Sequence, residues 1–191
     1  MTTQLTTPTH IYHVSAIDNL DSILEHGIQP QSTHRDTLED DLSTVAAAHG
    51  IELPIDRSKC VFCYPTLSGA TELMSITDED RSPLSPREAI VVIDGAQIHK
   101  QLYVGEFDLI SDAIDLQHMD EPDAAITAES YEDALRRYAA SLTPFHSFET
   151  LGDSLTEYQT PEVVIQDGVD PNHILEWRLL KQIQEGTDSC A

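Results

Sequence analysis

The chain has 191 residues, enough for one domain with a buried core, and its 40% hydrophobic content argues against global disorder. Ten basic residues face 34 acidic ones, for a formal net charge of -24, and only three of the basic residues are lysines. This balance is typical of a halophilic protein from a salt-saturated cytoplasm, where ~1 M salt shortens the screening length to about 3 Å and makes self-repulsion tolerable.

The same charge bears on the partners that are open to the chain. A protein this acidic binds nucleic acid poorly at ordinary ionic strength, because phosphate contacts supply most of the affinity. In a high-salt cell, counterion release contributes little to the nucleic-acid affinity of any protein. The net charge therefore indicates the habitat of the protein and does not exclude a nucleic-acid partner. An acidic protein of an ordinary cell that binds a basic partner is the alternative interpretation.

Cysteine usage and hydropathy predict a cytoplasmic protein. Cys60, Cys63 and Cys190 form no disulfide framework, which favours a reducing interior. Cys60 and Cys63 stand in an apolar run typical of a strand, where positions three apart face opposite sides, so we expect two core cysteines and no zinc site. The first residues lack the basic and apolar regions of a signal peptide, and the longest apolar strand, 89–93, is too short to cross a bilayer.

The first predicted element is a short strand at 11–15, which carries His13 and leads into a helix. The apolar residues after the strand recur at helical spacing: Ile17, Leu20, Ile23 and Leu24. Ser15 and Asp18 have the spacing of a capping box at a helix start. Gly27 stands where a left-handed cap ends a helix. A histidine at the end of a strand, beside a helix start, is well placed to hold a small polar ligand.

The rest of the chain mixes strands and helices without regular β-α-β alternation, which predicts the α+β class. Residues 89–94 form a continuous β-branched run, of the kind that is buried on both faces. Further strands are expected at 60–64, 102–104, 107–110 and 162–165, and helices at 37–49, 68–76 and 130–142. Loops are expected at 78–86, 112–123 and 143–161, and a final apolar unit at 174–180.

Three polar side chains at the edges of predicted strands are candidates for chemistry: His13, Tyr64 and Glu162. A histidine donor, a flat aromatic ring and a carboxylate are what a site needs to hold a nicotinamide riboside and to stabilise positive charge on its sugar. Each residue also has a structural explanation. His13 could be a core histidine bonded to the backbone, Tyr64 an aromatic residue at the rim before a turn, and Glu162 the solvated first residue of its strand.

Three stretches of the chain resemble the ADP-ribosyltransferase superfamily, and most closely the DarT-type enzymes that modify DNA. The motif that resembles the family's first strand and helix comprises Ile11-Tyr12-His13, Ile17-Asp18-Asn19-Leu20, Ile23-Leu24 and Gly27. Residues 60–67 are similar to its second core strand. Residues 162–165, 169–171 and 173–174 look like its late strand with the catalytic glutamate. The resemblance implies one domain over 1–191, a split β-sandwich of two small sheets with flanking helices, and NAD bound as a substrate between the sheets.

The resemblance also implies roles for single residues. Glu162 would stabilise the oxocarbenium-like transition state as nicotinamide leaves. Arg35 would meet phosphate or assist the acceptor, and its alternative is a surface arginine in a polar link. His13 would hold the ribose and the nicotinamide amide and assist the reaction. Contacts with NAD are implied for His13, Val14, Ser15, Asn19 and Tyr64.

One departure from the family concerns the residue that helps to choose the acceptor. Many relatives carry Gln or Glu two residues before the catalytic glutamate, where this chain has Thr160. Gln159 lies one position further away, and a shift of one along a strand turns a side chain to the other face. The resemblance therefore leaves the acceptor open between nucleic acid and protein.

Two functional hypotheses follow. The first is an NAD-dependent mono-ADP-ribosyltransferase, toxin-like, with a nucleic-acid or protein acceptor, an antitoxin as a conceivable partner and no membrane. The second is a non-catalytic module of the same fold that binds NAD, ADP-ribose or a partner. An RNA 2'-phosphotransferase shares the general fold, but it needs basic residues around an RNA end that are not visible in the chain. The nine histidines show no recognisable ligand spacing, so no metal is expected.

Overall fold

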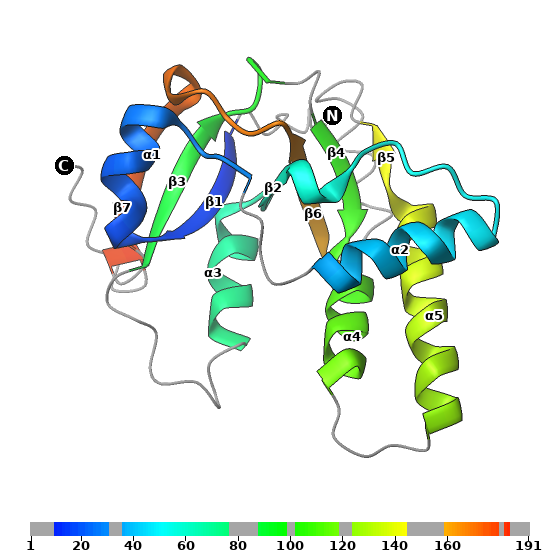
Figure 1. Ribbon diagram of the computed structural model, residues 1–191. Helices are drawn as coiled ribbons and strands as arrows, with labels where there is room; N and C mark the ends of the chain where they lie inside the picture. Colours follow the sequence, from blue (N-terminus) through cyan, green and yellow to red (C-terminus); the bar gives the residue numbers. More distant parts are fainter. Residues whose placement is uncertain are drawn as a thin grey trace, which may run out of the picture.

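The computed structural model describes residues 10–30, 36–76, 88–98, 102–118, 124–144, 159–179 and 182–183. Within these ranges, strands and helices are interspersed along the chain (Figure 1). The strands are β1 (His10–Ala16), β2 (Cys60–Cys63), β3 (Glu88–Asp94), β4 (Leu102–Glu106), β5 (Thr143–Pro144), β6 (Pro161–Gln166) and β7 (Ile174–Leu179). The helices are α1 (Leu20–His26), α2 (Asp36–Ala48), α3 (Leu67–Ile76), α4 (Phe107–His118) and α5 (Ala124–Ser141). Short 3-10 segments lie at Ile17–Asn19, Arg57–Lys59 and Pro171–His173.

The strands form two antiparallel sheets that meet at one pair of residues. The first sheet has the order β1-β3-β7 and the second the order β2-β6-β4-β5. Tyr12 of β1 and Tyr64, which follows β2, exchange two backbone hydrogen bonds, of 2.9 Å from Tyr12 N and 2.7 Å from Tyr64 N. The two sheets with their flanking helices confirm the predicted α+β class and the split β-sandwich.

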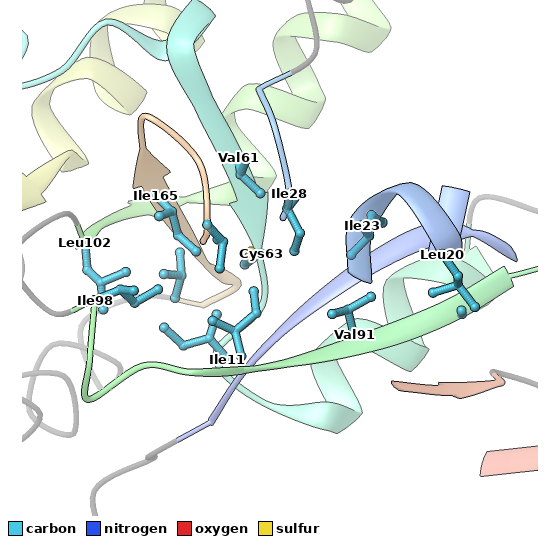
Figure 2. Packing of buried hydrophobic residues seen from close by; sticks show 14 of the residues in the cluster. Ile11, Leu20, Ile23, Ile28, Val61, Cys63, Val91, Ile98, Leu102 and Ile165 are labelled. Atoms are coloured by element: carbon cyan, nitrogen blue, oxygen red, sulfur yellow. The ribbon is translucent and has the colours of Figure 1, made fainter. Parts of the chain in front are cut away.

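The largest hydrophobic cluster joins the two sheets (Figure 2). It combines alternate residues of the first sheet, such as Ile11 and Val91, with Val61 and Ile165 of the second. Leu20 and Ile23 of α1 belong to the same cluster, which is why the apolar stripe of that helix was visible in the sequence. Burial of this shared face holds the sheets against each other.

A second cluster fills the space between the other face of the second sheet and three helices, α2, α4 and α5. Val164 of β6 points into it, whereas Val163 and Ile165 point into the first cluster, so β6 is apolar on both faces. Figure 1 shows the three helices together beside this sheet. Because side chains alternate along a strand, Glu162, two positions before Val164, also faces the helices.

A third, smaller cluster packs Ala70 of α3 against Ile90 of β3. Ile90 therefore faces α3, while Ala89, Val91 and Ile93 face the first cluster. This confirms the prediction that the strand at 89–94 is buried on both faces.

The two cysteines near β2 are core residues, as predicted. Cys60 belongs to the second cluster and Cys63 to the first, on opposite faces of the strand. Burial raises the pKa of Cys60 to about 12 and also raises the pKa of Cys63. Both groups are therefore neutral thiols near pH 7, which are poor metal ligands and poor nucleophiles.

The entry to the first helix differs from the predicted capping box. Ser15 lies within β1, and a 3-10 segment begins after Ala16, whose side chain makes no cap. Ser15 Oγ accepts from Asn19 Nδ2 at 3.4 Å instead. At the other end Gly27 does end the helix with a positive φ of 78°, and its N–H bonds to Ile23 O at 2.8 Å, but its ψ of -177° is extended and differs from the predicted left-handed cap. Any Cβ there would lie 2.0 Å from Val169 O.

The expected strand at 107–110 is wrong, because this stretch is the first turn of α4. Phe107, Ile110 and Ile114 recur at helical spacing and pack in the second cluster, which a strand would not allow. The expected loop at 112–123 is likewise helical as far as His118. Residues 119–123, 145–158 and 77–87, which include most of the other two expected loops, lie outside the described residues.

The helix expected at 130–142 begins earlier, at Ala124, and the final apolar unit is strand β7. Among the described residues, no helix is both long and apolar enough to pass through a bilayer. The same residues contain no group of three or more His, Cys, Asp or Glu arranged to hold a metal ion.

Candidate functional site

His13 lies on β1, at the point where the two sheets approach each other. Its Nδ1 lies 3.0 Å from Phe62 O and 3.9 Å from Cys63 Sγ. Burial lowers the pKa of His13, and the hydrogen bond to the Phe62 carbonyl opposes that shift only in part. The ring is therefore neutral near pH 7. A carbonyl oxygen can only accept, so Nδ1 carries the proton and Nε2 is left as an acceptor.

Tyr64 follows β2 and is anchored by its backbone. Its N–H and C=O both bond to Tyr12, and this pair links β1 to the end of β2. The half-buried side chain packs in the third cluster with Tyr12 and Val14. The aromatic ring is thus held at the junction of the sheets by main-chain bonds that do not depend on its own hydroxyl.

Glu162 is buried, and its carboxylate has two hydrogen-bond donors on one oxygen. Arg57 Nη1 donates to Glu162 Oε1 at 2.9 Å, and the Tyr138 hydroxyl donates to the same atom. Both partners donate, so the shared oxygen acts as an acceptor, as it does in a carboxylate. Glu162 alternates with Val163 along β6 and therefore faces the helices, next to Val164.

Arg57 is a component of this site that the sequence analysis missed. Its side chain is 2% exposed, and its guanidinium lies 4.4 Å from the ring centre of Phe62 and 4.5 Å from that of Tyr138. Arg57 Nε lies 3.3 Å from the Glu39 carboxylate on α2. A buried guanidinium needs such partners, because an uncompensated charge in the interior is costly. The only sequence signal is an arginine three residues before a buried strand.

The segment that leads into β6 is held by Glu106, the last residue of β4. The two carboxylate oxygens of Glu106 accept from the backbone N–H groups of Gln159 and Thr160, each at 2.7 Å. The Thr160 hydroxyl donates to Asp108 Oδ2 at 2.8 Å. The side chain of Thr160 therefore contacts α4, and two charge-assisted bonds from Glu106 fix the backbone just before Glu162.

The structure places the strands of the three predicted residues next to one another. His13 on β1 reaches the Phe62 carbonyl on β2, and β2 pairs with β6 so that Cys63 lies opposite Val163. The side chains differ in direction. His13 lies beside Cys63 in the cluster between the sheets, whereas Glu162 points toward the helices. Their joint contact with NAD stays a prediction.

The remaining predicted site residues lie near β1 or outside the described residues. Val14 packs in the third cluster, and Ser15 and Asn19 share the hydrogen bond at the surface between β1 and the following helix. Arg35 falls in the range 31–35, outside the described residues. Its proposed contact with phosphate or acceptor therefore stays a prediction.

No protein-family model and no curated protein matches the chain. Three solved structures do match it. Thermosipho africanus DarTG in complex with ADP-ribose is 13% identical, with a TM-score of 0.37, over 94% of this chain and 47% of that one. Thermus sp. 2.9 DarT in complex with NAD+ is 12% identical, with a TM-score of 0.42, over 96% and 92%. The same DarT in complex with ADP-ribosylated ssDNA is 12% identical, with a TM-score of 0.45, over 100% and 94%.

The fold is similar to that of DarT. The chain spans about half the length of the DarTG chain, at 47%.

Proposed function

We propose that this protein binds NAD and transfers its ADP-ribose to an acceptor with release of nicotinamide. The observation that carries the proposal is the junction of β1, β2 and β6. There, an oriented neutral His13, the anchored ring of Tyr64 and an oriented carboxylate, Glu162, come from three adjacent strand segments, with the Glu162 side chain directed toward the helices. These are the group types that the chemistry of a nicotinamide riboside requires.

In the proposed reaction, each residue has a separate task. Nε2 of His13 accepts a hydrogen bond from a ribose hydroxyl, and Tyr64 flanks the nicotinamide ring. The bond between the ribose and the nicotinamide nitrogen breaks, and its electron pair stays with nicotinamide, which leaves as a neutral molecule. Positive charge then develops on the ribose, and the Glu162 carboxylate lowers the barrier electrostatically. The acceptor forms the new bond to the ribose carbon and releases its proton to solvent.

The second candidate function is the non-catalytic module, and the burial of Glu162 favours it. The carboxylate is engaged by Arg57 and Tyr138, and the side chains of Glu162 and Arg57 are 4% and 2% exposed. A carboxylate that is already paired with a guanidinium exerts a weaker field on a substrate than an unpaired one. A binding site for NAD, ADP-ribose or a partner needs the oriented histidine and the aromatic ring, but not the carboxylate.

The acceptor, partners and location belong to the same proposal. A nucleic acid or a protein is the proposed acceptor, and an antitoxin is the proposed regulatory partner of a toxin-like enzyme in the cytoplasm of a halophile. Incubation of labelled NAD with single-stranded DNA, RNA and lysate protein in molar KCl identifies the acceptor class. Transfer of label to none of them would leave the binding module as the better description.

Calorimetry of NAD binding in molar KCl tests the division of roles. His13→Ala should weaken NAD binding by about tenfold, since it removes one hydrogen-bond acceptor from the bound ribose. Glu162→Gln should leave the affinity nearly unchanged, because its contribution is made to the transition state. His26→Ala, at an exposed position of α1, is the matched control. Equal affinities for NAD in the wild type and all three variants would contradict the role proposed for His13.

A further inference from the structure

The third strand of the first sheet, β7, is an end strand. In the order β1-β3-β7, it pairs with β3 on one side, and none of the described strands pairs with its other side. Figure 1 shows β7 at the margin of the molecule, beside β3 and away from the second sheet. An end strand presents backbone N–H and C=O groups that can pair with another strand.

The sequence of β7 is complementary to itself when it is read in the antiparallel direction. If two copies pair so that Trp177 lies opposite Trp177 of the other copy, Glu176 lies opposite Arg178. The regular part of β7 ends there, because the register with β3 shifts at Leu175. The same relation holds from either copy, because a two-fold axis passes between the two tryptophans. Opposite charges and apolar residues at directly facing positions are the pairs that stabilise antiparallel strands.

Three side chains of β7 are exposed to solvent: Leu175, Glu176 and Arg178. Leu175 is 50% exposed, one of two large hydrophobic residues that are strongly exposed in the described part of the chain. Glu176 and Arg178 lie on one face of β7, where Arg178 Nη2 donates to Glu176 Oε1 at 2.6 Å, and they are 38% and 36% exposed. A second copy would offer each charge another partner of opposite sign at the facing position.

We propose that two copies of this chain associate through β7, in antiparallel register about Trp177. The product is a continuous six-stranded sheet with the order β1-β3-β7-β7-β3-β1. This inference goes beyond the proposed function and is independent of it. The strand that carries His13 lies at the opposite margin of its sheet from β7, so the two candidate sites stay open at the two ends.

Charge reversal tests the register directly. Glu176→Arg places an arginine opposite Arg178 of the other copy, and Arg178→Glu places a glutamate opposite Glu176, so each variant repels itself. A mixture of the two variants restores two pairs of opposite charge, as does the double variant E176R/R178E. Sedimentation equilibrium of the full chain is the measurement, at the lowest KCl concentration that preserves the wild-type circular-dichroism spectrum.

The expected result is a wild-type dimer and at least a tenfold weaker dimer constant for each single variant. The equimolar mixture and the double variant should regain wild-type association. Glu132→Arg and Arg137→Glu, exposed on α5, carry the same changes in net charge and should associate like the wild type.

Three results would overturn the proposal. One is a wild-type chain that stays monomeric up to 200 µM. Another is single variants that associate as strongly as the α5 controls. The last is a mixture that remains monomeric although each variant keeps its fold, since that would exclude the pairing of position 176 with position 178.

Discussion

Arg57 and Glu162 form an ion pair with 2.9 Å between Nη1 and Oε1, although the two residues are 105 positions apart in the chain. The pair joins the segment before β2 to the start of β6. Tyr138 of α5 donates to the same oxygen of Glu162, and Glu39 of α2 lies at the other edge of the guanidinium. The candidate catalytic carboxylate is thus oriented by both sheet and helices.

The first prediction concerns the stability of this ion pair. Arg57→Met should lower the free energy of unfolding by about 3–5 kcal/mol, because it leaves a buried carboxylate without its cation. The double variant R57M/E162Q should be more stable than R57M alone, since the uncompensated charge is gone. Urea unfolding at constant molar KCl measures both, with the exposed Arg137→Met as the control. An R57M chain as stable as that control would show that the pair contributes nothing.

The second prediction compares two tyrosines on α5 that each donate to a carboxylate. Tyr138 donates to Glu162, and Tyr131 donates to Asp41 Oδ2 at 2.8 Å. Tyr138→Phe and Tyr131→Phe should each lower the free energy of unfolding by about 1.5–3 kcal/mol, the contribution of a hydrogen bond to a charged group. Only Tyr138→Phe should slow the release of nicotinamide from NAD, because only this hydroxyl orients Glu162. Equal rates for the two variants would contradict a positioning role for Tyr138.

The third prediction is a pH dependence that arises from His13. Burial lowers its pKa in the folded state below the ordinary value of 6.5, so the unfolded chain binds the proton more readily. The contribution of His13 to stability is therefore complete above pH 6.5 and is lost as the pH falls toward the lowered folded pKa. In that window, the wild type should lose up to about 1.4 kcal/mol per pH unit relative to His13→Gln.

The control for this pH dependence is His26→Gln, whose imidazole is exposed on α1. The difference between wild type and His13→Gln should be flat above pH 7. Nitrogen-15 spectra should also show the proton of His13 on Nδ1 at neutral pH, as its bond to the Phe62 carbonyl requires. A proton on Nε2, or a folded pKa above 6.5, would disagree with the structure.

Secondary structure could be predicted from the sequence where the hydrophobic periodicity is strong. β3 is buried on both faces and shows a continuous β-branched run, and α1 is buried on one face and shows an apolar stripe that ends at Gly27. Both patterns are local in the sequence, so both elements could be predicted. The start of α4 is not legible in the same way. Over these four residues, Phe107 and Leu109 fit the period of a strand and Phe107 and Ile110 that of a helix, and contacts with α5 decide for the helix.

The candidate site shows the same division between local and distant information. Tyr64 directly follows β2 and Glu162 is the second residue of β6, close to the predicted strand ends, whereas the expected place of His13 at the end of its strand is wrong, because His13 is the central residue of β1. The direction of the Glu162 side chain could not be predicted, since it follows from the order β2-β6-β4-β5 and from the register of each pair. Arg57 gives no local sign of its partners, because both carboxylates come from distant segments.

The release of nicotinamide from NAD in molar KCl tests the proposed transferase most directly. The wild type should release it, and Glu162→Gln should be slower by about 10²–10³-fold, the usual cost of removing one electrostatic contact to a transition state. Glu132→Gln, at an exposed position of α5, should keep the wild-type rate. A folded wild type that binds NAD without releasing nicotinamide, or a Glu162→Gln variant with an unchanged rate, would contradict catalysis by this carboxylate.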